Sequence, residues 1–343
     1  MLLFRGMILK MNKTSILLLC GGGSSEHEVS LVSAAYLLDQ LQKQPEFEVH
    51  FVEITKDAWL LDDAHVNLDI NKKALISDTG EIKIDYIVPC VHGYPGETGD
   101  LQSMFELAGI PYFGCGAEAS TNSFNKITSK LWYDAIGIPN TPYLFLVDAD
   151  QKSLDKASQA FEKWGKVFVK AACQGSSVGC YSVTEKSELV KAIQSAFHYS
   201  DQVLIEKSVK PRELEVAAYE YQGTLFVSKP GEVIAPDNAF YTYEEKYSAD
   251  SHSHTEVEAS NLTAQQLSDI ETFSKTVFNQ MKLKDLSRID FFLTEENELL
   301  LNEVNTFPGM TPISMFPKMV EHNGHQFSEF LASAIKSALN PKV

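Results

Sequence analysis

Two strand-like runs near the C-terminal end, residues 288–293 and 299–305, constrain the fold more than any other feature of the sequence. Both runs are rich in residues that favour β-strands, and the polar dipeptide Glu296-Asn297 between them is typical of a turn. The sequence therefore predicts a β-hairpin at this point of the chain.

One face of this hairpin gathers charged side chains. Alternate side chains of a strand share a face, so Arg288 projects with Asp290, and Glu303 with Asn305 on the second strand. Folding places Asp290 roughly opposite Glu303, and such a cluster is costly without a compensating cation. All-oxygen ligands suit Mg²⁺, with substrate phosphates in its remaining positions. The alternative is an ion pair on a solvated face, but four such residues on paired strands favour metal–phosphate chemistry.

Length and charge limit the architecture and the partners. A chain of 343 residues is too long for one ordinary core, so two or three domains are expected. The net charge of -17 argues against nucleic acid or an anionic membrane as a partner. The odd number of scattered cysteines fits a reducing compartment, and no apolar run is long enough to span a bilayer. We expect a cytoplasmic protein whose translation begins at Met11, with residues 1–10 as an extension.

Strand and helix patterns alternate over the first third of the chain, which predicts a parallel, doubly wound sheet. A capping-box pattern at Ser25 and Glu28 predicts the start of the first helix. The expected strands are 15–19, 47–54 and 86–91, and a later helix is expected at 101–108.

Two further units are predicted after residue 125. The second contains a helix at 126–136 and strands at 166–170 and 203–207. The third contains strands at 214–221 and 224–228, a polar stretch at 244–260, a helix around 267–281, the hairpin, and a tail helix at 327–339.

Three loops that follow predicted strands could bind ligands. Residues 170–179 pack small residues between two glycines and could lay backbone N–H groups along a phosphate, although the loop matches neither a Walker A loop nor the dinucleotide fingerprint. The alternative is a mobile surface loop. Glu26 and Glu28 stand at a strand-to-helix junction, where open α/β sheets bind ligands, or they merely complement the helix dipole. His92 could transfer a proton, but a lone histidine is more often structural.

Two other segments have a functional and a plain interpretation. Residues 242–247 are charged and aromatic, as lids often are, or form a solvated excursion. Pro308 and Gly309 force a turn beside the predicted metal site, where the Gly309 amide could bind an oxyanion. A plain turn is the alternative.

In this order and together, these segments closely resemble the D-alanine–D-alanine ligases of the ATP-grasp superfamily. The resemblance spans nearly the whole chain from about Thr14, and its first and last segments are the most specific. The matching segments are 22–30, His92-Gly93 with Gly96-Glu97, 175–179, Lys246-Tyr247, 288–290 and 303–311.

The resemblance implies an α/β fold that becomes α+β in the C-terminal half, with three domains. These are an N-terminal Rossmann-like domain at 1–125, a central ATP-grasp subdomain at 126–210, and a C-terminal ATP-grasp subdomain at 211–343 that carries the metal and substrate sites.

The resemblance also implies a role for individual residues. Asp290, Glu303 and Asn305 would hold two Mg²⁺ ions, or Mn²⁺. ATP would be bound through its phosphates by Lys126 and Lys170, through its base and ribose by Glu206, Lys207, Val209 and Glu213, and also by Lys246 and Asn302. Glu26 would bind the ammonium group of the first D-alanine, near His92, in a triad with Ser176 and Tyr247. Arg288 and the Gly309 amide would stabilise the tetrahedral intermediate, and Ser314 and Met315 would hold the second carboxylate.

The activity implied is the ATP-dependent ligation of two D-alanine molecules through an acyl phosphate, for peptidoglycan synthesis, by a homodimer. The nearest alternative is another ATP-grasp carboxylate–amine ligase, or one that forms D-alanyl-D-lactate. A nucleotide-dependent oxidoreductase is suggested only by Gly21-Gly22-Gly23, which lacks the full glycine spacing. A non-catalytic nucleotide-binding regulator would not need the intact charged hairpin.

Overall fold

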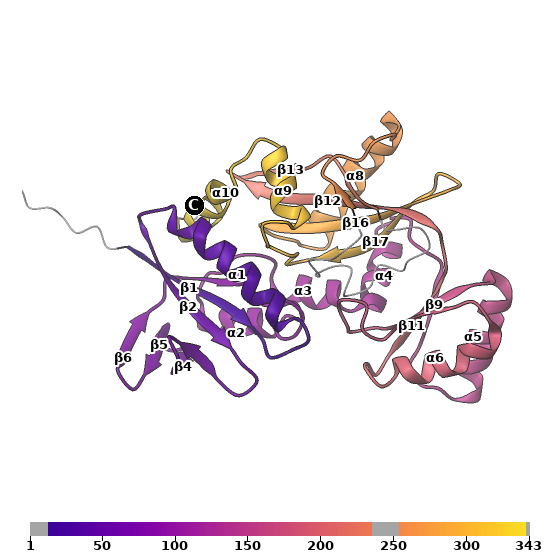
Figure 1. Cartoon of the computed structure of the whole chain (residues 1–343), viewed down its shortest axis with the longest axis horizontal. Helices are drawn as coiled ribbons and strands as arrows, with labels where there is room; N and C mark the ends of the chain where they lie inside the picture. Colours follow the sequence, from indigo (N-terminus) through magenta and orange to yellow (C-terminus); the bar gives the residue numbers. More distant parts are fainter. Residues whose placement is uncertain (1–12, 235–253, 341–343) are drawn as a thin grey trace, which may run out of the picture.

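The computed structural model describes residues 13–234 and 254–340, and its strands form three sheets (Figure 1). The proposed extension at 1–10 and the proposed lid at 242–247, including Lys246 and Tyr247, lie outside the described residues. Within the described ranges, no helix combines the length and the apolar character needed to cross a bilayer.

The first sheet has seven strands in the order β6-β5-β4-β3-β2-β1-β7. Only β2, β1 and β7 pair in parallel, and the others extend the sheet as an antiparallel meander. The predicted parallel sheet is therefore confirmed for β2, β1 and β7 but is wrong for the other four strands, whose antiparallel meander was not predicted. The strands are β1 (Thr14–Gly21), β2 (Phe47–Ile54), β3 (Trp59–Leu61), β4 (Ala64–Asp69), β5 (Ala74–Ser77), β6 (Gly80–Lys83) and β7 (Tyr86–Pro89).

The helices of this part are α1 (His27–Gln42), α2 (Asp100–Ala108) and α3 (Ala117–Phe124). The capping box predicted from Ser25 and Glu28 is wrong. Helix α1 has Glu26 as its N-cap residue, without a side-chain cap hydrogen bond. The preceding turn is closed instead by Ser24, whose Oγ accepts a hydrogen bond from the Glu26 amide at 3.3 Å. The Glu26 carboxylate is consequently available for contacts outside the helix.

The second sheet is antiparallel, in the order β10-β9-β11-β8, and is backed by α5 (Gln151–Trp164) and α6 (Leu189–Ala196) (Figure 1). The short 3₁₀ helix η1 (Lys186–Glu188) precedes α6. Val167, Val169, Val203 and Ile205 pack with these helices into a core of their own. The alternate residues of the same strands face the other way. The strands are β8 (Tyr143–Leu146), β9 (Val167–Ala171), β10 (Cys180–Val183) and β11 (Val203–Lys207).

The third sheet has the order β15-β14-β12-β16-β17, with β13 also paired to β12. Its strands are β12 (Pro211–Tyr221), β13 (Thr224–Val227), β14 (Gly231–Ile234), β15 (His254–Glu256), β16 (Leu286–Thr294) and β17 (Leu299–Asn305). Helices α4 (Lys126–Ala135), α8 (Ala264–Gln280), α9 (Met315–His322) and α10 (Phe327–Leu339) complete the fold.

The predicted hairpin is confirmed as β16 and β17. Asp290 stands opposite Glu303, as expected, but the register then shifts so that Phe291 stands opposite Leu301. Asn302 is therefore the extra residue of a β-bulge. Bulges bend a strand and re-aim side chains, and they occur often beside active sites.

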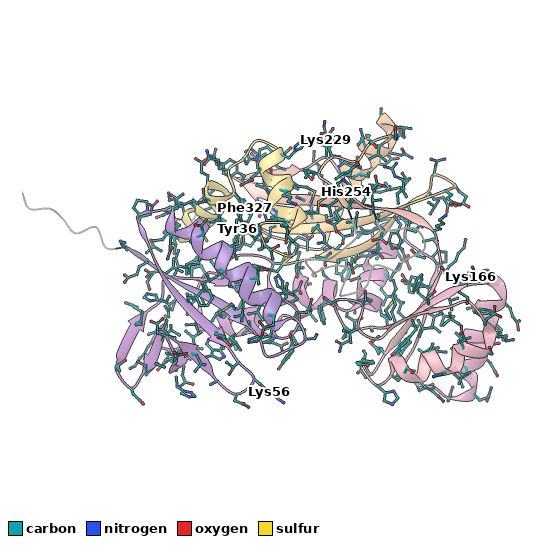
Figure 2. The ribbon with its side chains drawn as sticks, viewed as in Figure 1. Tyr36, Lys56, Lys166, Lys229, His254 and Phe327 are labelled. Atoms are coloured by element: carbon teal, nitrogen blue, oxygen red, sulfur yellow. The ribbon has the colours of Figure 1, made fainter. Side chains whose placement is uncertain are left out.

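The first and third sheets share one hydrophobic core, which includes Leu18 of β1, Tyr219 of β12 and Phe330 of α10. Tyr36 of α1 stacks on Phe327 of α10 with ring centroids 5.7 Å apart, and the two labelled side chains lie together in Figure 2. The second sheet takes no part in this core, since its apolar residues form a separate cluster. The domain boundaries proposed near residues 125 and 210 fall between α3 and α4 and between β11 and β12, and stay predictions.

Candidate active site

A cleft with a volume of about 1460 Å³ opens between the three sheets. Every proposed site residue that the structure describes lines this cleft, although these residues come from distant parts of the sequence. They are Glu26, His92, Lys126, Lys170, Ser176, Glu206, Lys207, Val209, Glu213, Arg288, Asp290, Asn302, Glu303, Asn305, Gly309, Ser314 and Met315.

A buried carboxylate lies between two lysines at one end of the cleft. Glu206 of β11 forms ion pairs with Lys170 of β9 through Oε2 and with Lys130 of α4 through Oε1, the latter at 2.5 Å. Burial opposes the ionisation of Glu206, but the two ammonium groups outweigh burial and lower its pKa to about 2. Glu206 is therefore charged at neutral pH.

The glycine-rich loop after β9 lies beside these residues. The ammonium group of Lys126 donates to the Gln174 carbonyl oxygen in this loop. Ser176 and Ser177 have left-handed backbone conformations, with φ of 48° and 63°. This conformation is uncommon for residues other than glycine and asparagine. Here it accompanies a turn of the loop that lets the Ser176 hydroxyl reach Glu26.

Glu26 meets this loop from the start of α1. The Ser176 hydroxyl donates to Glu26 Oε1 at 2.5 Å, across 150 positions of sequence. The other oxygen, Oε2, lies between two glycines: a Cβ at Gly93 would come within 2.6 Å of it, and one at Gly175 within 2.9 Å. The predicted contact between Glu26 and Ser176 is present, while Tyr247, the third member of the proposed triad, lies outside the described residues.

Glu97 adds a second carboxyl group near Glu26. It accepts a hydrogen bond from the Gly93 amide at 2.7 Å. Burial, and then the proximity of Glu26, raise the pKa of Glu97 to about 8. Its environment therefore favours the protonated form of Glu97 more than water does.

His92 is buried, with 4% of its surface exposed. Its Nε2 lies 2.9 Å from the Ser33 hydroxyl oxygen, which also accepts from the Met310 amide at 3.3 Å. Burial lowers the pKa of His92 to about 4, and a hydrogen bond with the Phe307 backbone offsets only part of this effect. His92 is thus neutral and braces the loop after β17.

The charged face of the hairpin forms the floor of the cleft. Arg288 pairs bidentately with Asp290, through Nε at 2.8 Å and Nη2 at 2.7 Å, and its Nε lies 3.4 Å from Glu215. The Asn305 amide nitrogen donates to Asp290 at 3.0 Å. Within the ranges that the structure describes, no three or more His, Cys, Asp or Glu side chains are arranged as a ready metal site.

This donor set nevertheless suits a hard cation. Asp290 and Glu303 face each other across the strands, and Asn305 supplies a further oxygen. Mg²⁺ is typically held by one or two carboxylates and completes its shell with waters and substrate phosphates, so a closed protein cage is not required.

The loop after β17 carries the remaining candidates. Ser314, the N-cap residue of α9, accepts a hydrogen bond from the Thr311 amide at 3.0 Å, and a Cβ at Gly309 would lie 3.0 Å from its Oγ. Met315 follows at the start of α9 and is buried.

Three residues of the site were given no role by the sequence analysis, and one of them, Glu97, appeared there only within a matching segment. Lys130 follows Lys126 by one helical turn, so the i, i+4 spacing on α4 could have indicated it. Glu215 shares a strand face with Glu213, two positions earlier, and stands opposite Asp290.

Comparison with known proteins identifies the family. The N-terminal domain model of the D-ala D-ala ligases matches residues 15–115, and their C-terminal domain model matches residues 131–336. The chain belongs to the D-alanine–D-alanine ligase family.

A D-alanine–D-alanine ligase from Vibrio atlanticus is 67% identical over 331 residues, which cover 96% of this chain and 100% of the relative. The crystal structure of a D-alanyl-alanine synthetase A from Vibrio cholerae is 64% identical, with a TM-score of 0.93 over 96% of this chain and 99% of that one. A D-Ala:D-Ser ligase from Enterococcus faecalis is 28% identical, with a TM-score of 0.84 over 96% of this chain and 100% of that one. The ATP-grasp fold expected from the sequence is therefore confirmed.

Proposed function

We propose that this member of the D-alanine–D-alanine ligase family joins two D-alanine molecules at the expense of ATP, for peptidoglycan synthesis. The observation that carries the proposal is the cleft, in which a candidate amino-acid site at Glu26, a candidate phosphate site at Lys126 and Lys170, and the charged hairpin face one another. This arrangement suits a reaction that activates a carboxylate with a phosphoryl group and then transfers the acyl group.

The reaction has two steps. A carboxylate oxygen of the first D-alanine attacks the γ-phosphorus of ATP, and the bond between this phosphorus and the β-phosphate oxygen breaks. The products of this step are ADP and D-alanyl phosphate, which is an acyl phosphate. The neutral amine of the second D-alanine then attacks the acyl carbon, the bond to the phosphate oxygen breaks, and the dipeptide and phosphate are released. The attacking nitrogen gives up a proton in this second step, and the released phosphate can take it up.

The residues of the chain bind and orient the reactants. Glu26, fixed by Ser176, would pair with the ammonium group of the first D-alanine. Arg288 presents a planar fork of donors that a lysine could not reproduce, and with the Gly309 amide would stabilise the oxyanion of the tetrahedral intermediate. Ser314 and Met315 would hold the carboxylate of the second D-alanine.

The nucleotide would extend from the hairpin toward the second sheet. Lys126 and Lys170 would neutralise its phosphates, while Glu206, Glu213, Lys207 and Val209 would surround the base and ribose. Asn302, at the bulge, and Lys246 would complete the ATP site.

Asp290, Glu303 and Asn305 would hold two Mg²⁺ or Mn²⁺ ions. These ions would supply neutralisation of charge on the transferring phosphoryl group.

The acyl phosphate must be protected from hydrolysis, so water has to be excluded during turnover. We propose that the loop at 170–179 and the lid at 242–247, including Tyr247, perform this exclusion. We further propose that the protein is cytoplasmic, in keeping with five cysteines that form no disulfide among the described residues. We also propose that it is a homodimer, as the family resemblance implies.

One assay tests the proposed function. Phosphate release is measured with ATP, Mg²⁺ and D-alanine, with L-alanine and D-lactate as parallel acceptors, and the product is identified by mass spectrometry. We expect D-alanyl-D-alanine with D-alanine alone. Phosphate release that does not depend on D-alanine, or a depsipeptide as the main product, would reject the proposal.

A further inference from the structure

Lys130 is a buried lysine for which the proposed reaction has no use. Its side chain is 3% exposed, and its ammonium group lies 2.5 Å from Glu206 Oε1. It also donates to the Thr141 carbonyl oxygen at 3.4 Å and lies 5.7 Å from the centre of the Tyr143 ring. Lysine is almost never fully buried unless it is paired, so the carboxylate of Glu206 accounts for its position.

The two lysines that share Glu206 differ in their freedom to move. The side chain of Lys170 is 17% exposed. Lys170 lies near the end of β9, where the glycine-rich loop begins. Lys130 is enclosed between α4 and the ring of Tyr143. An anionic ligand in the cleft can therefore attract Lys170 away from Glu206, whereas Lys130 has nowhere else to go.

This difference matters because Glu206 cannot remain alone. A buried carboxylate whose partner is removed is strongly destabilised. With Lys130 in place, Glu206 keeps one cation after Lys170 has turned toward a phosphate. Without Lys130, Lys170 would be the one cation that pairs with Glu206 among the described residues, and a nucleotide would have to break that pair.

We propose that Lys130 is a positioning residue for nucleotide binding, which holds Glu206 ionised through Oε1, frees Lys170 for the phosphates and leaves Oε2 to accept a hydrogen bond from the amino group of adenine. This inference rests on the proposed function, since it takes ATP as the nucleotide and places its base beside Glu206.

The inference extends to base selectivity. Adenine presents an amino donor at C6, whereas guanine presents a carbonyl acceptor. An ionised carboxylate accepts a hydrogen bond from the amino group of adenine and repels the carbonyl oxygen of guanine. A protonated carboxyl group can instead donate a hydrogen bond to guanine. Lys130 therefore favours adenine without touching it.

Among the residues that the structure describes, the other groups near these three charges do not replace Lys130. Tyr133 and Asp134 of α4 and Tyr143 of β8 carry no positive charge, and Tyr143 donates to Asp134 at 2.7 Å. Burial lowers the pKa of Lys130, and the paired Glu206 offsets part of this effect. In a variant without Lys130, Glu206 would be ionised while paired with Lys170, but would take up a proton once a nucleotide drew Lys170 away.

The test is the affinity of Lys130→Met for ADP and GDP in Mg²⁺, measured by calorimetry from pH 6 to pH 8 and compared with the wild-type protein. In Lys130→Met, ADP binding would be coupled to proton uptake by Glu206, so its ADP affinity should fall as the pH rises. Relative to the wild-type protein, we expect a loss of at least tenfold at pH 8 and a smaller loss at pH 6. We also expect the preference for ADP over GDP to fall at least tenfold at pH 6. The wild-type protein should show neither effect.

Two further variants separate this role from simple packing. In a Glu206→Gln background, Lys130→Met should add no pH dependence, since the carboxylate it compensates is gone. Lys130→Arg keeps the charge and should restore the wild-type pH profile. If Lys130→Met alone does not fold, the Glu206→Gln and Lys130→Met/Glu206→Gln proteins are compared, and equal ADP affinities support the proposal.

An unchanged ADP affinity and base preference in Lys130→Met at every pH would overturn the inference, as would a lower melting temperature with unchanged binding. So would a pH-dependent loss that persists in the Glu206→Gln background. A wild-type protein that binds ADP but forms no dipeptide would reject the proposed function instead, and the comparison of variants would still stand.

Discussion

Replacing Gly93 with alanine should damage the binding of the first D-alanine far more than it damages folding. Gly93 has a φ of +65°, and a Cβ added there would lie 2.6 Å from Glu26 Oε2. Since Oε2 is the far end of a flexible side chain, the carboxylate can move aside at little cost to the fold. Its displacement would, however, remove it from the Ser176 hydroxyl and from the position proposed for the substrate ammonium.

Two contributions set the expected size of the effect. A non-glycine residue in the left-handed region costs about 1–2 kcal/mol of stability. A hydrogen bond to a charged group is worth about 1.5–3 kcal/mol, so losing the contact with the ammonium should lower kcat/KM for D-alanine roughly 10- to 100-fold. The KM for ATP should change little, because the atoms nearest the added Cβ belong to Glu26 and Ser24 and not to residues proposed to bind ATP.

Gly137 provides the matched control. Its φ is +72°, close to that of Gly93, but a Cβ there would meet nothing within 4 Å. Gly137→Ala should therefore show the backbone strain alone. Steady-state kinetics and thermal melts of both variants are compared, and the reasoning is refuted if Gly93→Ala has the same kcat/KM for D-alanine as Gly137→Ala.

Three other predictions follow from the site. Ser176→Ala removes the 2.5 Å hydrogen bond to Glu26 and should lower kcat/KM for D-alanine roughly 10- to 100-fold with little change in melting temperature; wild-type kinetics would contradict the contact's role. Asp290→Asn and Glu303→Gln should each abolish phosphate release while circular dichroism stays native, and near-wild-type turnover in either would reject the metal assignment. His92 has a pKa of about 4 when folded and 6.5 ordinarily, so the unfolded chain binds the proton first as pH falls. The free energy of unfolding should therefore fall by up to about 3 kcal/mol as the pH is lowered from 6.5 to 4. Denaturant unfolding of His92→Asn should lack this decline.

The sequence predicted the parts of the fold that local chemistry determines. The hairpin was found because strand-forming residues and a polar turn stand at adjacent positions, and the pairing of Asp290 with Glu303 followed from alternation. The bulge at Asn302 was not found, since a single extra residue leaves no mark in composition. The meander of β3 to β6 was missed for a similar reason: strands of 3 to 6 residues are too short to establish a period.

Long-range contacts of the site were harder to predict. The contact between Glu26 and Ser176 was expected only from the family resemblance, because nothing in either local sequence points to the other. Lys130 was overlooked because a lysine on a helix is normally solvated, and its burial depends on β8 and β11 arriving from later in the chain. The predicted capping box was wrong because the helix begins one residue later, with Glu26 at the N-cap position. The local pattern could not show that the carboxylate of Glu26 bonds with Ser176.

The core shared by the first and third sheets sets a limit on exchanging parts between relatives. Leu18 and Tyr36 come from the beginning of the chain, but their packing partners Tyr219, Phe327 and Phe330 come from the last third. A chimera that replaced only the first 125 residues would join two halves of a core that were never selected to fit. The second sheet with α5 and α6 has an apolar interior that closes on itself, so its exchange need preserve only the contacts of its other face with α4, such as that between Leu204 and Ile127.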